Sequence, residues 1–326
     1  MTTIPNAPPV ISPISPDQER PLWSVMIPVF NCARFLPDAL GSVLMQGIPE
    51  EKMQIEVIDD ASTDADIEAL VNEIGKGRIK YYRQENNVGS LLNFATCINR
   101  SKGKLVHLLH GDDKVHLGYY EKIEDLFRRH PEAGAAFTRY SCIDENNNKL
   151  HDKTPEMQEE GILPDWLLAI GERQRIQYAS ITVRRDVYEK LGAFFGIVYA
   201  EDWEMWVRIA RYYPVAYTPD ILAEYRLHSE SISGGKYLSG EHLQDLLKAM
   251  MLIQRHLPEE KRQSIFRKSR KYYASYGLKV AQKLWCRYHD KQLVEAQIKH
   301  ALKLSRNPKL YLPIAKMYLK LLLDRA

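Results

Sequence analysis

Residues 23–60, WSVMIPVFNCARFLPDALGSVLMQGIPEEKMQIEVIDD, decide the class of fold. A short apolar run rich in Val and Ile stops at Asn31, a helical pattern follows, and a second apolar run closes on two acids. The same order of strand and helix repeats, with further strands predicted at 78–84 and 104–109. Alternation of this kind predicts βαβ units, and therefore an α/β fold whose mostly parallel sheet has helices on its faces.

Polar residues collect where the predicted strands end. Pro28–Asn31 follow the first strand, Asp59 and Asp60 close the second, and His110–Asp113 follow the fourth. Ligands of open α/β sheets bind outside the carboxyl ends of the strands, so we expect these segments to lie close together. Two adjacent carboxylates after the apolar run of HLLHGDDKV (107–115) also call for a compensating cation.

The two ends of the chain and the segment before residue 235 differ in composition from the α/β part. Residues 1–21 carry several prolines but lack the basic and apolar regions of a signal peptide, which predicts a flexible or extended lead-in. Residues 214–233 predict a strand pair that runs into a polar loop, and Ser233-Gly234-Gly235 marks the expected boundary. Residues 236–326 read as amphipathic helices and predict an all-α extension.

Composition excludes several classes of protein. The 326 residues carry a net charge of +3, too small for a nucleic-acid binder recognised by bulk electrostatics. The four cysteines form no C-x-x-C pair, so neither a zinc site nor a disulfide framework is indicated, and a reducing cytoplasm is expected. No stretch of eighteen consecutive apolar residues is present, so no membrane span is expected.

Five motifs follow one another along the chain: PVFNCARFLPDALGSVLMQ (28–46), EVIDDASTD (56–64), NNVGSLLNFATCINRSKGKLVHLLHGDD (86–113), EDWEMWVRIA (201–210) and YRLHSESIS (225–233). Together they resemble the motifs of inverting glycosyltransferases of family 2, which have the GT-A fold. The resemblance implies a GT-A, Rossmann-like, mostly parallel sheet flanked by helices, with an all-α C-terminal extension. It implies a glycosyltransferase domain at 22–235, with a nucleotide-binding half at 22–115 and an acceptor-binding half at 116–235, followed by the helical segment 236–326.

The resemblance also implies a set of residues that contact the nucleotide and diphosphate of the donor. This chain departs from the family in two places: His110 stands where the Asp-x-Asp-Asp motif has its first acid, and the basic residue expected after Asn-x-Gly is missing. Helix capping is the alternative interpretation for Asp60, Asp112 and Asp113. The implied donor-binding residues are Pro28, Val29, Asn31, Asp59, Asp60, Asn87, Gly89, His110, Gly111, Asp112 and Arg226.

Metal and catalytic roles follow from the same resemblance. Asp112 and His228 are the implied ligands of Mn²⁺ or Mg²⁺, and Asp202 is the implied general base. Glu201 and Trp203 are the implied acceptor contacts. Acids in a first helical turn also complement the helix dipole, and a Trp on an amphipathic helix is often part of a core, so both alternatives stay open.

The expected activity is transfer of a sugar from a nucleotide diphosphate sugar, with UDP expected, to a glycan or lipid-linked acceptor in bacterial surface polysaccharide synthesis. A nucleotidyltransferase is disfavoured because the N-terminal motif lacks a Gly-rich basic loop. A nucleotide-sugar-binding or adaptor protein without catalysis remains the alternative. The expected location is the cytoplasm, extending to the inner face of its membrane, because the basic, amphipathic last helix suits either a membrane surface or packing against the catalytic domain.

Overall fold

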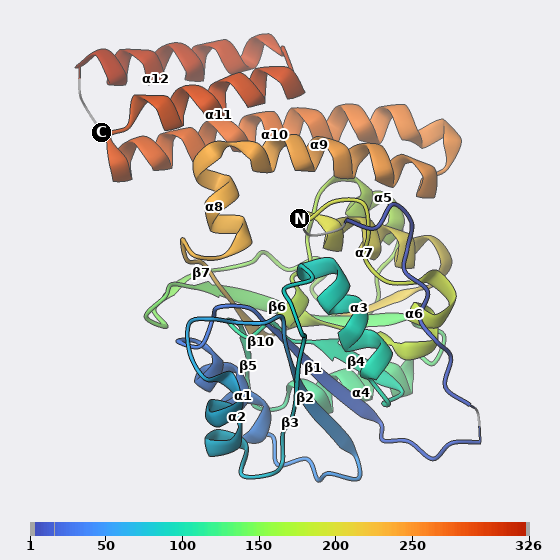
Figure 1. The fold of residues 1–326 in the computed structure, drawn as a ribbon. Coiled ribbons are helices and arrows are strands. Elements are labelled where there is room, and N and C mark those ends of the chain that lie inside the picture. Colours follow the sequence, from blue (N-terminus) through green and yellow to red (C-terminus); the bar gives the residue numbers. More distant parts are fainter. Residues whose placement is uncertain (1–3, 16, 324–326) are drawn as a thin grey trace. The chain divides into compact units, whose positions relative to one another are not determined.

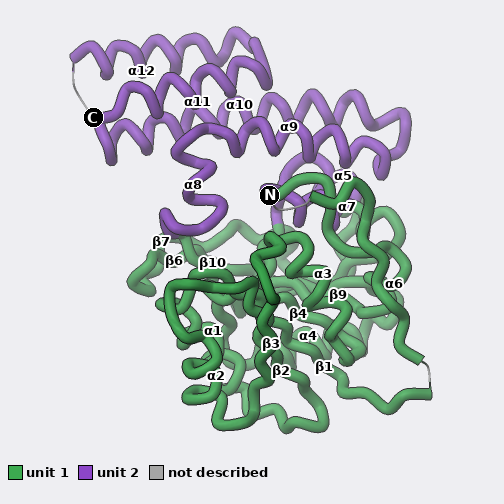
Figure 2. Tube along the Cα trace, viewed as in Figure 1, with its two compact units in different colours: residues 1–166, 176–198, 208–227 green, residues 167–175, 199–207, 228–326 purple. Residues whose placement is uncertain are grey.

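The structure is a computed structural model that describes residues 4–15 and 17–323. Parts of two sequence predictions, residues 1–3 and 16 of the lead-in and 324–326 of the last helix, lie outside the described residues. The chain divides into two compact units, coloured separately in Figure 2. The first unit comprises residues 1–166, 176–198 and 208–227, and the second comprises 167–175, 199–207 and 228–326.

One ten-stranded mixed sheet forms the centre of the first unit in the part of the chain that the structure describes (Figure 1). The order along the sheet is β3-β2-β1-β4-β9-β6-β10-β5, with β7 paired to β6 and β8 paired to β10. The strands are β1 (Trp23–Val29), β2 (Met53–Asp59), β3 (Lys80–Arg83), β4 (Leu105–Leu108), β5 (Lys114–Val115), β6 (Ala135–Ile143), β7 (Lys149–Asp152), β8 (Gly161–Ile162), β9 (Ile181–Arg184) and β10 (Val215–Arg226).

The N-terminal half of this sheet is parallel, as the alternation of strands and helices predicted. β1 pairs in parallel with both β2 and β4, and β2 pairs in parallel with β3. All seven residues of β1 are buried, since helices cover both faces of the strand, and this explains its unbroken apolar run. Antiparallel pairing enters through β9, which lies between β4 and β6.

Helices of the first unit divide between the two faces of the sheet (Figure 1). Side chains of α1, α2 and α4 share one apolar core with alternate residues of β1 and β2. The opposite face of β1, β2 and β4 is contacted by α3. The helices are α1 (Leu36–Leu44), α2 (Ile67–Gly75), α3 (Ser90–Arg100), α4 (Tyr119–Arg129) and α6 (Arg185–Leu191), with a short 3₁₀ turn η1 (Tyr178–Ser180).

The second unit is helical, and the predicted all-α C-terminal extension is confirmed. No described helix is both long and apolar enough to cross a membrane. Asp290 caps α11, where its side chain accepts hydrogen bonds from the backbone N–H groups of Gln292 and Leu293. The helices are α8 (Ile232–Ser239), α9 (Glu241–Ile253), α10 (Glu259–Tyr288), α11 (Lys291–Leu304) and α12 (Tyr311–Leu323), with 3₁₀ turns η2 (Gln254–His256) and η3 (Pro308–Leu310). The second unit also includes residues 167–172 of α5 (Trp166–Glu172) and residues 201–207 of α7 (Glu201–Tyr212).

Two local predictions differ from the structure. The strand pair predicted after residue 214 is one long strand, β10, whose pairing with β6 shifts register between Thr218 and Ala223. The polar loop predicted before residue 235 contains the start of helix α8, which begins after Ser231. The Ser231 hydroxyl accepts a hydrogen bond from the N–H of Gly234, so a serine interpreted as part of a loop is a helix cap.

The lead-in lies extended along the first unit. Ile11 is buried, and the backbone carbonyl oxygens of Pro5 and Pro9 accept hydrogen bonds from Gly196 and Ala193. The Arg185 guanidinium donates to the carbonyl oxygen of Ser12. These contacts give the described part of the lead-in a defined path on the domain.

Candidate active site

The ends of β1, β2 and β4 meet at one edge of the sheet, as the sequence predicts. The N–H of Asp60 donates to the carbonyl of Val29, at 2.8 Å, and the N–H of Gly111 donates to that of Pro28, at 3.2 Å. Beside them, Asn31 has a positive φ of 49°, and its side-chain oxygen accepts a hydrogen bond from the N–H of Thr63. The predicted convergence of these segments is confirmed. Asn31 is exposed, whereas Val29, Asp60 and Gly111 are buried.

Asp59 is fully buried at the end of β2, and both of its carboxylate oxygens are engaged. One oxygen accepts from the N–H of Ser62 at 2.9 Å, and the other accepts from the Tyr81 hydroxyl at 2.8 Å and from the Arg83 guanidinium. Burial of the Tyr81 hydroxyl raises its pKa to about 12. Asp59 therefore anchors Arg83, a cation that remains 45% exposed at this edge.

Asp60 holds the Asn-x-Gly turn in place. Its two carboxylate oxygens accept hydrogen bonds from the N–H groups of Val88, at 2.7 Å, and Gly89, at 2.9 Å. Gly89 has a φ of 87°, which favours glycine, while Asn87 before it is exposed. Burial raises the pKa of Asp60, and the two N–H donors oppose that rise. The capping alternative is not observed, because the side chain that caps α2 belongs to Asp66.

The segment His110–Asp113 forms a tight turn directly after β4. A Cβ atom on Gly111 would lie 2.9 Å from the Cys32 sulfur and 3.0 Å from a Val29 methyl carbon, so this close approach requires glycine. Helix α4 begins after Gly118 and has no side-chain cap. The acids at 112 and 113 are therefore not caps of that helix.

His110 lies between two aromatic rings. Its imidazole stacks on Tyr178 at 4.2 Å and on Phe94 at 5.1 Å between ring centroids. Burial lowers the pKa of His110, so the ring is held in its neutral form. Its Nε2 atom is buried and has no hydrogen-bond partner among the described residues. A neutral imidazole with an unused nitrogen is a suitable metal ligand.

His110, Asp112 and Asp113 form a group that could hold a divalent cation. One ligand atom from each residue lies within 4.8 Å of the others. Asp113 is 1% exposed, and its Oδ2 atom has no hydrogen-bond partner among the described residues. Burial and the charge of Asp112 both raise the pKa of Asp113, while the backbone N–H and the charge of Arg226 oppose that rise. Two carboxylates and an imidazole fit Mn²⁺ or Mg²⁺.

Arg226, predicted as a diphosphate contact, is bound within the first unit. It is 1% exposed, and its Nε donates to the carbonyl of Asp112 at 2.8 Å. Its Nη2 atom donates to the side chains of Asp38 and Asn147, each at 2.9 Å. Its backbone N–H donates to Asp113 at 2.9 Å. In this structure Arg226 holds the turn that carries the two acids.

Asp202 lies in the second unit, in the first turn of α7. The side chain is buried, and its oxygens accept from the N–H of Trp203, at 2.7 Å, and from the amide of Gln174. Burial raises the pKa of Asp202 to about 7, and the two donors oppose that rise. A carboxylate with this pKa can accept a proton near neutral pH, which is what a general base requires.

The other predicted residues of the second unit lie as follows. Trp203 is 0% exposed, its indole N–H donates to the carbonyl of Ile170 at 2.6 Å, and its ring packs on Tyr273. These contacts agree with the core alternative, and its acceptor role stays a prediction. Glu201 is 8% exposed. His228 is half-buried, and its carbonyl accepts from the Ser231 hydroxyl at 2.9 Å.

Three residues at the strand-end edge were missed by the sequence reasoning. Arg83 ends β3, and its position at a parallel strand end was the signal that could have found it. Phe94 and Tyr178 enclose His110, although they are far apart in sequence. No sequence spacing predicts that Phe94 and Tyr178 contact His110.

The fold and these strand-end acids define a GT-A type of protein. The family model described as "Glycosyl transferase family 2" matches residues 24–192. The chain belongs to glycosyltransferase family 2, as its motifs predicted.

Relatives among curated proteins carry the same general name. An uncharacterized glycosyltransferase of Rickettsia felis is 29% identical over 233 residues, which cover 68% of this chain and 36% of that protein. Another, from Haemophilus influenzae, is 26% identical and covers 65% of this chain and 68% of its own length. The match thus spans about a third of the Rickettsia felis relative.

Solved structures share the fold. The S. aureus protein TarS, residues 1–349 in complex with UDP-GlcNAc, superposes with a TM-score of 0.62 at 15% identity, over 85% of this chain and 79% of that one. The mannosyltransferase PcManGT of Pyrobaculum calidifontis, in complex with GDP-Man and Mn²⁺, gives 0.58 at 16% identity, over 99% and 92%. The predicted GT-A fold is confirmed.

Proposed function

We propose that this protein is an inverting glycosyltransferase that moves a sugar from a nucleotide diphosphate donor, a UDP-sugar, to a glycan or lipid-linked acceptor. The proposed setting is bacterial surface polysaccharide synthesis in the cytoplasm, at the inner face of its membrane. The observation that carries the proposal is the gathering of four acids, Asp59, Asp60, Asp112 and Asp113, at one sheet edge.

Each strand-end residue has a proposed part in holding the donor. The segment Pro28–Asn31, which is buried at Pro28 and Val29 and exposed at Asn31, is proposed to border the base and ribose. Asp60 orders the Asn87–Gly89 turn, so that its backbone is rigid before the donor arrives. Arg83 is exposed at the same edge and supplies a positive charge that the sequence lacks after Asn-x-Gly.

The leaving diphosphate carries negative charge that the site must neutralise. His110, Asp112 and Asp113 would hold Mn²⁺ or Mg²⁺, which when bound stabilises the departing diphosphate. Arg226 positions this turn through the Asp112 carbonyl and the Asp113 carboxylate. We therefore assign Arg226 a positioning role in place of direct contact with the phosphates. His228 remains a further proposed ligand.

Transfer itself is a single displacement. Asp202 removes the proton from an acceptor hydroxyl, and the acceptor oxygen bonds to the anomeric carbon as the bond to the diphosphate oxygen breaks. Attack from the opposite side inverts the anomeric centre. A pKa of about 7 leaves Asp202 ionised enough at neutral pH to accept this proton, yet basic enough to retain it. Glu201 and Trp203 are proposed to border the acceptor.

Release of nucleotide diphosphate tests the proposal. The purified chain is incubated with Mn²⁺ or Mg²⁺ and a panel of UDP- and GDP-sugars, with cell-envelope glycolipids as acceptors. We expect one donor to be consumed and the Asp202→Asn variant to bind that donor without turnover. Asp186→Asn is the matched control, because Asp186 is an exposed acid in the first turn of α6. Turnover in Asp202→Asn would refute the assignment of the base.

A nucleotide-sugar-binding protein without catalysis is the second candidate. It is favoured by His110, which stands where the family has an acid. Under that alternative, a donor raises the melting temperature but no diphosphate is released with any acceptor. If no member of the panel stabilises the protein, both candidates fail.

A further inference from the structure

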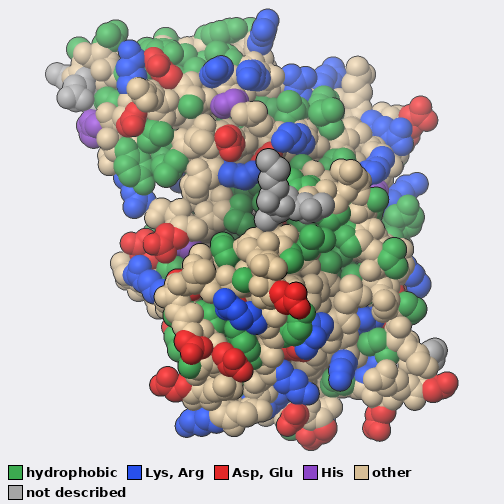
Figure 3. Space-filling view, viewed as in Figure 1, with side chains coloured by type: hydrophobic (Ala, Val, Ile, Leu, Met, Phe, Trp, Pro, Cys, Tyr) green, Lys and Arg blue, Asp and Glu red, His purple; other side chains and the backbone are tan. Residues whose placement is uncertain are grey.

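Helix α12 presents apolar side chains on the side that is not packed. Ile314 and Met317 are buried against the rest of the second unit. Facing solvent are Leu312, which is 64% exposed, Leu319 at 55% and Leu322 at 82%. Figure 3 shows hydrophobic and basic side chains together at the surface over α12. Helix α12 is thus apolar on both its packed and its exposed side. A row of exposed apolar side chains is unfavourable in water and indicates a surface that binds a partner.

Helical geometry places most of the exposed leucines on one strip. At about 100° per residue, Leu312, Leu319 and Leu323 fall within about 40° of one another, opposite the buried side. Leu322 lies about 80° from Leu312, on the flank away from the lysines. Lys316 and Lys320 border the strip along one flank. None of the described carboxylates lies within ion-pair distance of either lysine. The outer face therefore combines apolar side chains with positive charge that no carboxylate among the described residues pairs with.

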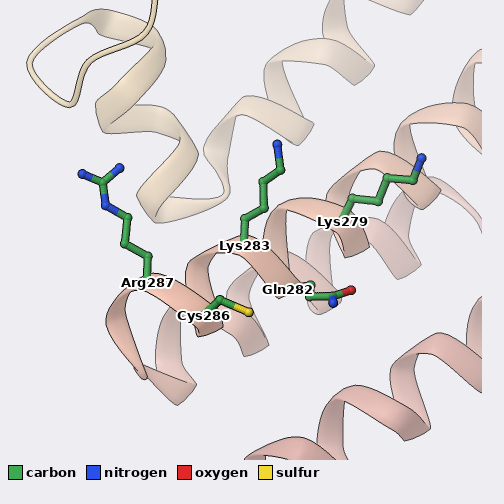
Figure 4. Close-up of a pocket in the computed structure, with 5 residues that line it drawn as sticks. All are labelled: Lys279, Gln282, Lys283, Cys286 and Arg287. Atoms are coloured by element: carbon green, nitrogen blue, oxygen red, sulfur yellow. The ribbon is translucent and has the colours of Figure 1, made fainter. Parts of the chain in front are cut away.

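The charge of the surrounding helices is strongly one-sided. Residues 261–320 contain sixteen Lys and Arg against the two acids Asp290 and Glu295, a net charge of +14. The whole chain carries +3, so all other residues together carry −11. Part of this charge lines an open groove of about 660 Å³ on α10. Figure 4 shows Lys279, Lys283 and Arg287 projecting from the same side of that helix.

We propose that α12 docks on an anionic lipid surface. Leu312, Leu319 and Leu322 enter the boundary between headgroups and acyl chains, while Lys316 and Lys320 lie at the lipid phosphates. A second copy of this chain fits less well, because a two-fold contact would bring the lysines of both copies together. A bilayer rich in anionic lipid supplies both the apolar phase and the opposite charge.

This inference deepens the proposed function by placing the enzyme beside a lipid-linked acceptor, but it depends on α12 alone. Co-sedimentation of the full chain with vesicles tests it, using phosphatidylcholine alone or an equal mixture with phosphatidylglycerol. We expect binding to the anionic vesicles only, weakened by added salt. Equal binding to both kinds of vesicle, or to neither, would overturn the proposal.

Variants on the exposed face identify the helix responsible. Leu319→Ser and Leu322→Ser should each weaken vesicle binding by about tenfold, and Lys316→Glu should weaken it further at low salt. Met251→Ser is the matched control, since Met251 is an exposed apolar residue of α9. Lys283→Glu on α10 is the control for charge. If either control weakens binding as strongly as the α12 variants, α12 is not the docking helix.

Two further readouts separate the possible failures. Light scattering measures the oligomeric state, and loss of a dimer in Leu319→Ser with vesicle binding unchanged would show that a second copy covers α12. Donor-induced stabilisation of the same variants should be unchanged, so loss of vesicle binding is not a loss of folding or of the donor site. Donor binding without vesicle binding would refute the docking surface and leave the proposed function standing.

Discussion

Replacing Asp202 by asparagine gives a prediction in which activity and stability change in opposite directions. Burial raises the pKa of Asp202 from 3.8 to about 7 in the folded chain. The folded protein therefore binds more protons than the unfolded chain between these values. The free energy of unfolding contributed by this group is greatest below pH 3.8 and is lost as the pH rises towards 7.

The size of the effect follows from the same pKa. The full rise corresponds to about 4 kcal/mol of stability lost between acid and alkaline pH, as an upper limit. Between pH 6 and pH 8 the loss is about 1.4 kcal/mol, because the group passes from mostly protonated to mostly ionised. An asparagine side chain cannot ionise, so the Asp202→Asn variant should lack this loss and unfold at higher urea concentration than the native chain at pH 8.

Activity should fall in the same variant. Below pH 7 the native kcat/KM should decline about tenfold per pH unit, because the proton-accepting form of Asp202 becomes scarce. Asp202→Asn should lower kcat by about a thousandfold at pH 8. The assays are release of nucleotide diphosphate across pH 5.5–9, a range chosen around that pKa of about 7, and urea unfolding at two pH values.

The helix-dipole alternative predicts that the Asp202→Asn variant is less stable than the native chain and keeps its turnover. If Asp202 only complements the dipole of α7, removing its charge should cost about 0.5 kcal/mol and leave turnover intact. Asp186→Asn measures that ordinary cost, because Asp186 occupies the first turn of α6. An Asp202→Asn variant that is less stable at pH 8 and still active would refute the reasoning.

Three further substitutions test the turn that carries the acids. Arg226→Gln removes the donor to the Asp112 carbonyl and should cost about 3 kcal/mol in urea unfolding, with a smaller Mn²⁺-dependent rise in Tm; an unchanged Mn²⁺ effect would contradict the positioning role. Gly111→Ala places a carbon 2.9 Å from the Cys32 sulfur and should cost about 2 kcal/mol, so a neutral result would argue against this packing. His110→Ala empties the space between the rings of Phe94 and Tyr178 and should cost about 2 kcal/mol in urea unfolding. The same variant should bind Mn²⁺ more weakly in a titration, and unchanged Mn²⁺ binding would show that the imidazole is not a ligand.

Local patterns were enough to predict the fold class and the edge at which the site lies. Strands and helices of the N-terminal half have distinct periods, and parallel strands place their carboxyl ends together. Asp59, Asp60 and Asp112 could therefore be assigned to one edge from the sequence alone. The predicted loop before residue 235 was wrong because Ser231, whose residue type is typical of both loops and caps, is the N-cap of α8.

The roles of individual side chains were decided by contacts that no spacing reveals. Arg226 lies 114 positions from Asp112, yet its hydrogen bonds hold the metal-binding turn. His110 was unexplained in the sequence, and its environment comes from Phe94 and Tyr178 on two other elements. Such contacts depend on how the elements pack, so they are properties of tertiary structure.

The sequence by itself determined the alternation of strands and helices, the family and the edge of the sheet where acids gather, because these depend on local periodicity and on the order of motifs. Only the tertiary structure decided that Asp60 holds a turn, that His110 is a neutral imidazole between two rings, and that Asp202 has a pKa of about 7. The physical reason is that burial and hydrogen bonding set the charge and basicity of a side chain, and both come from residues distant in the sequence.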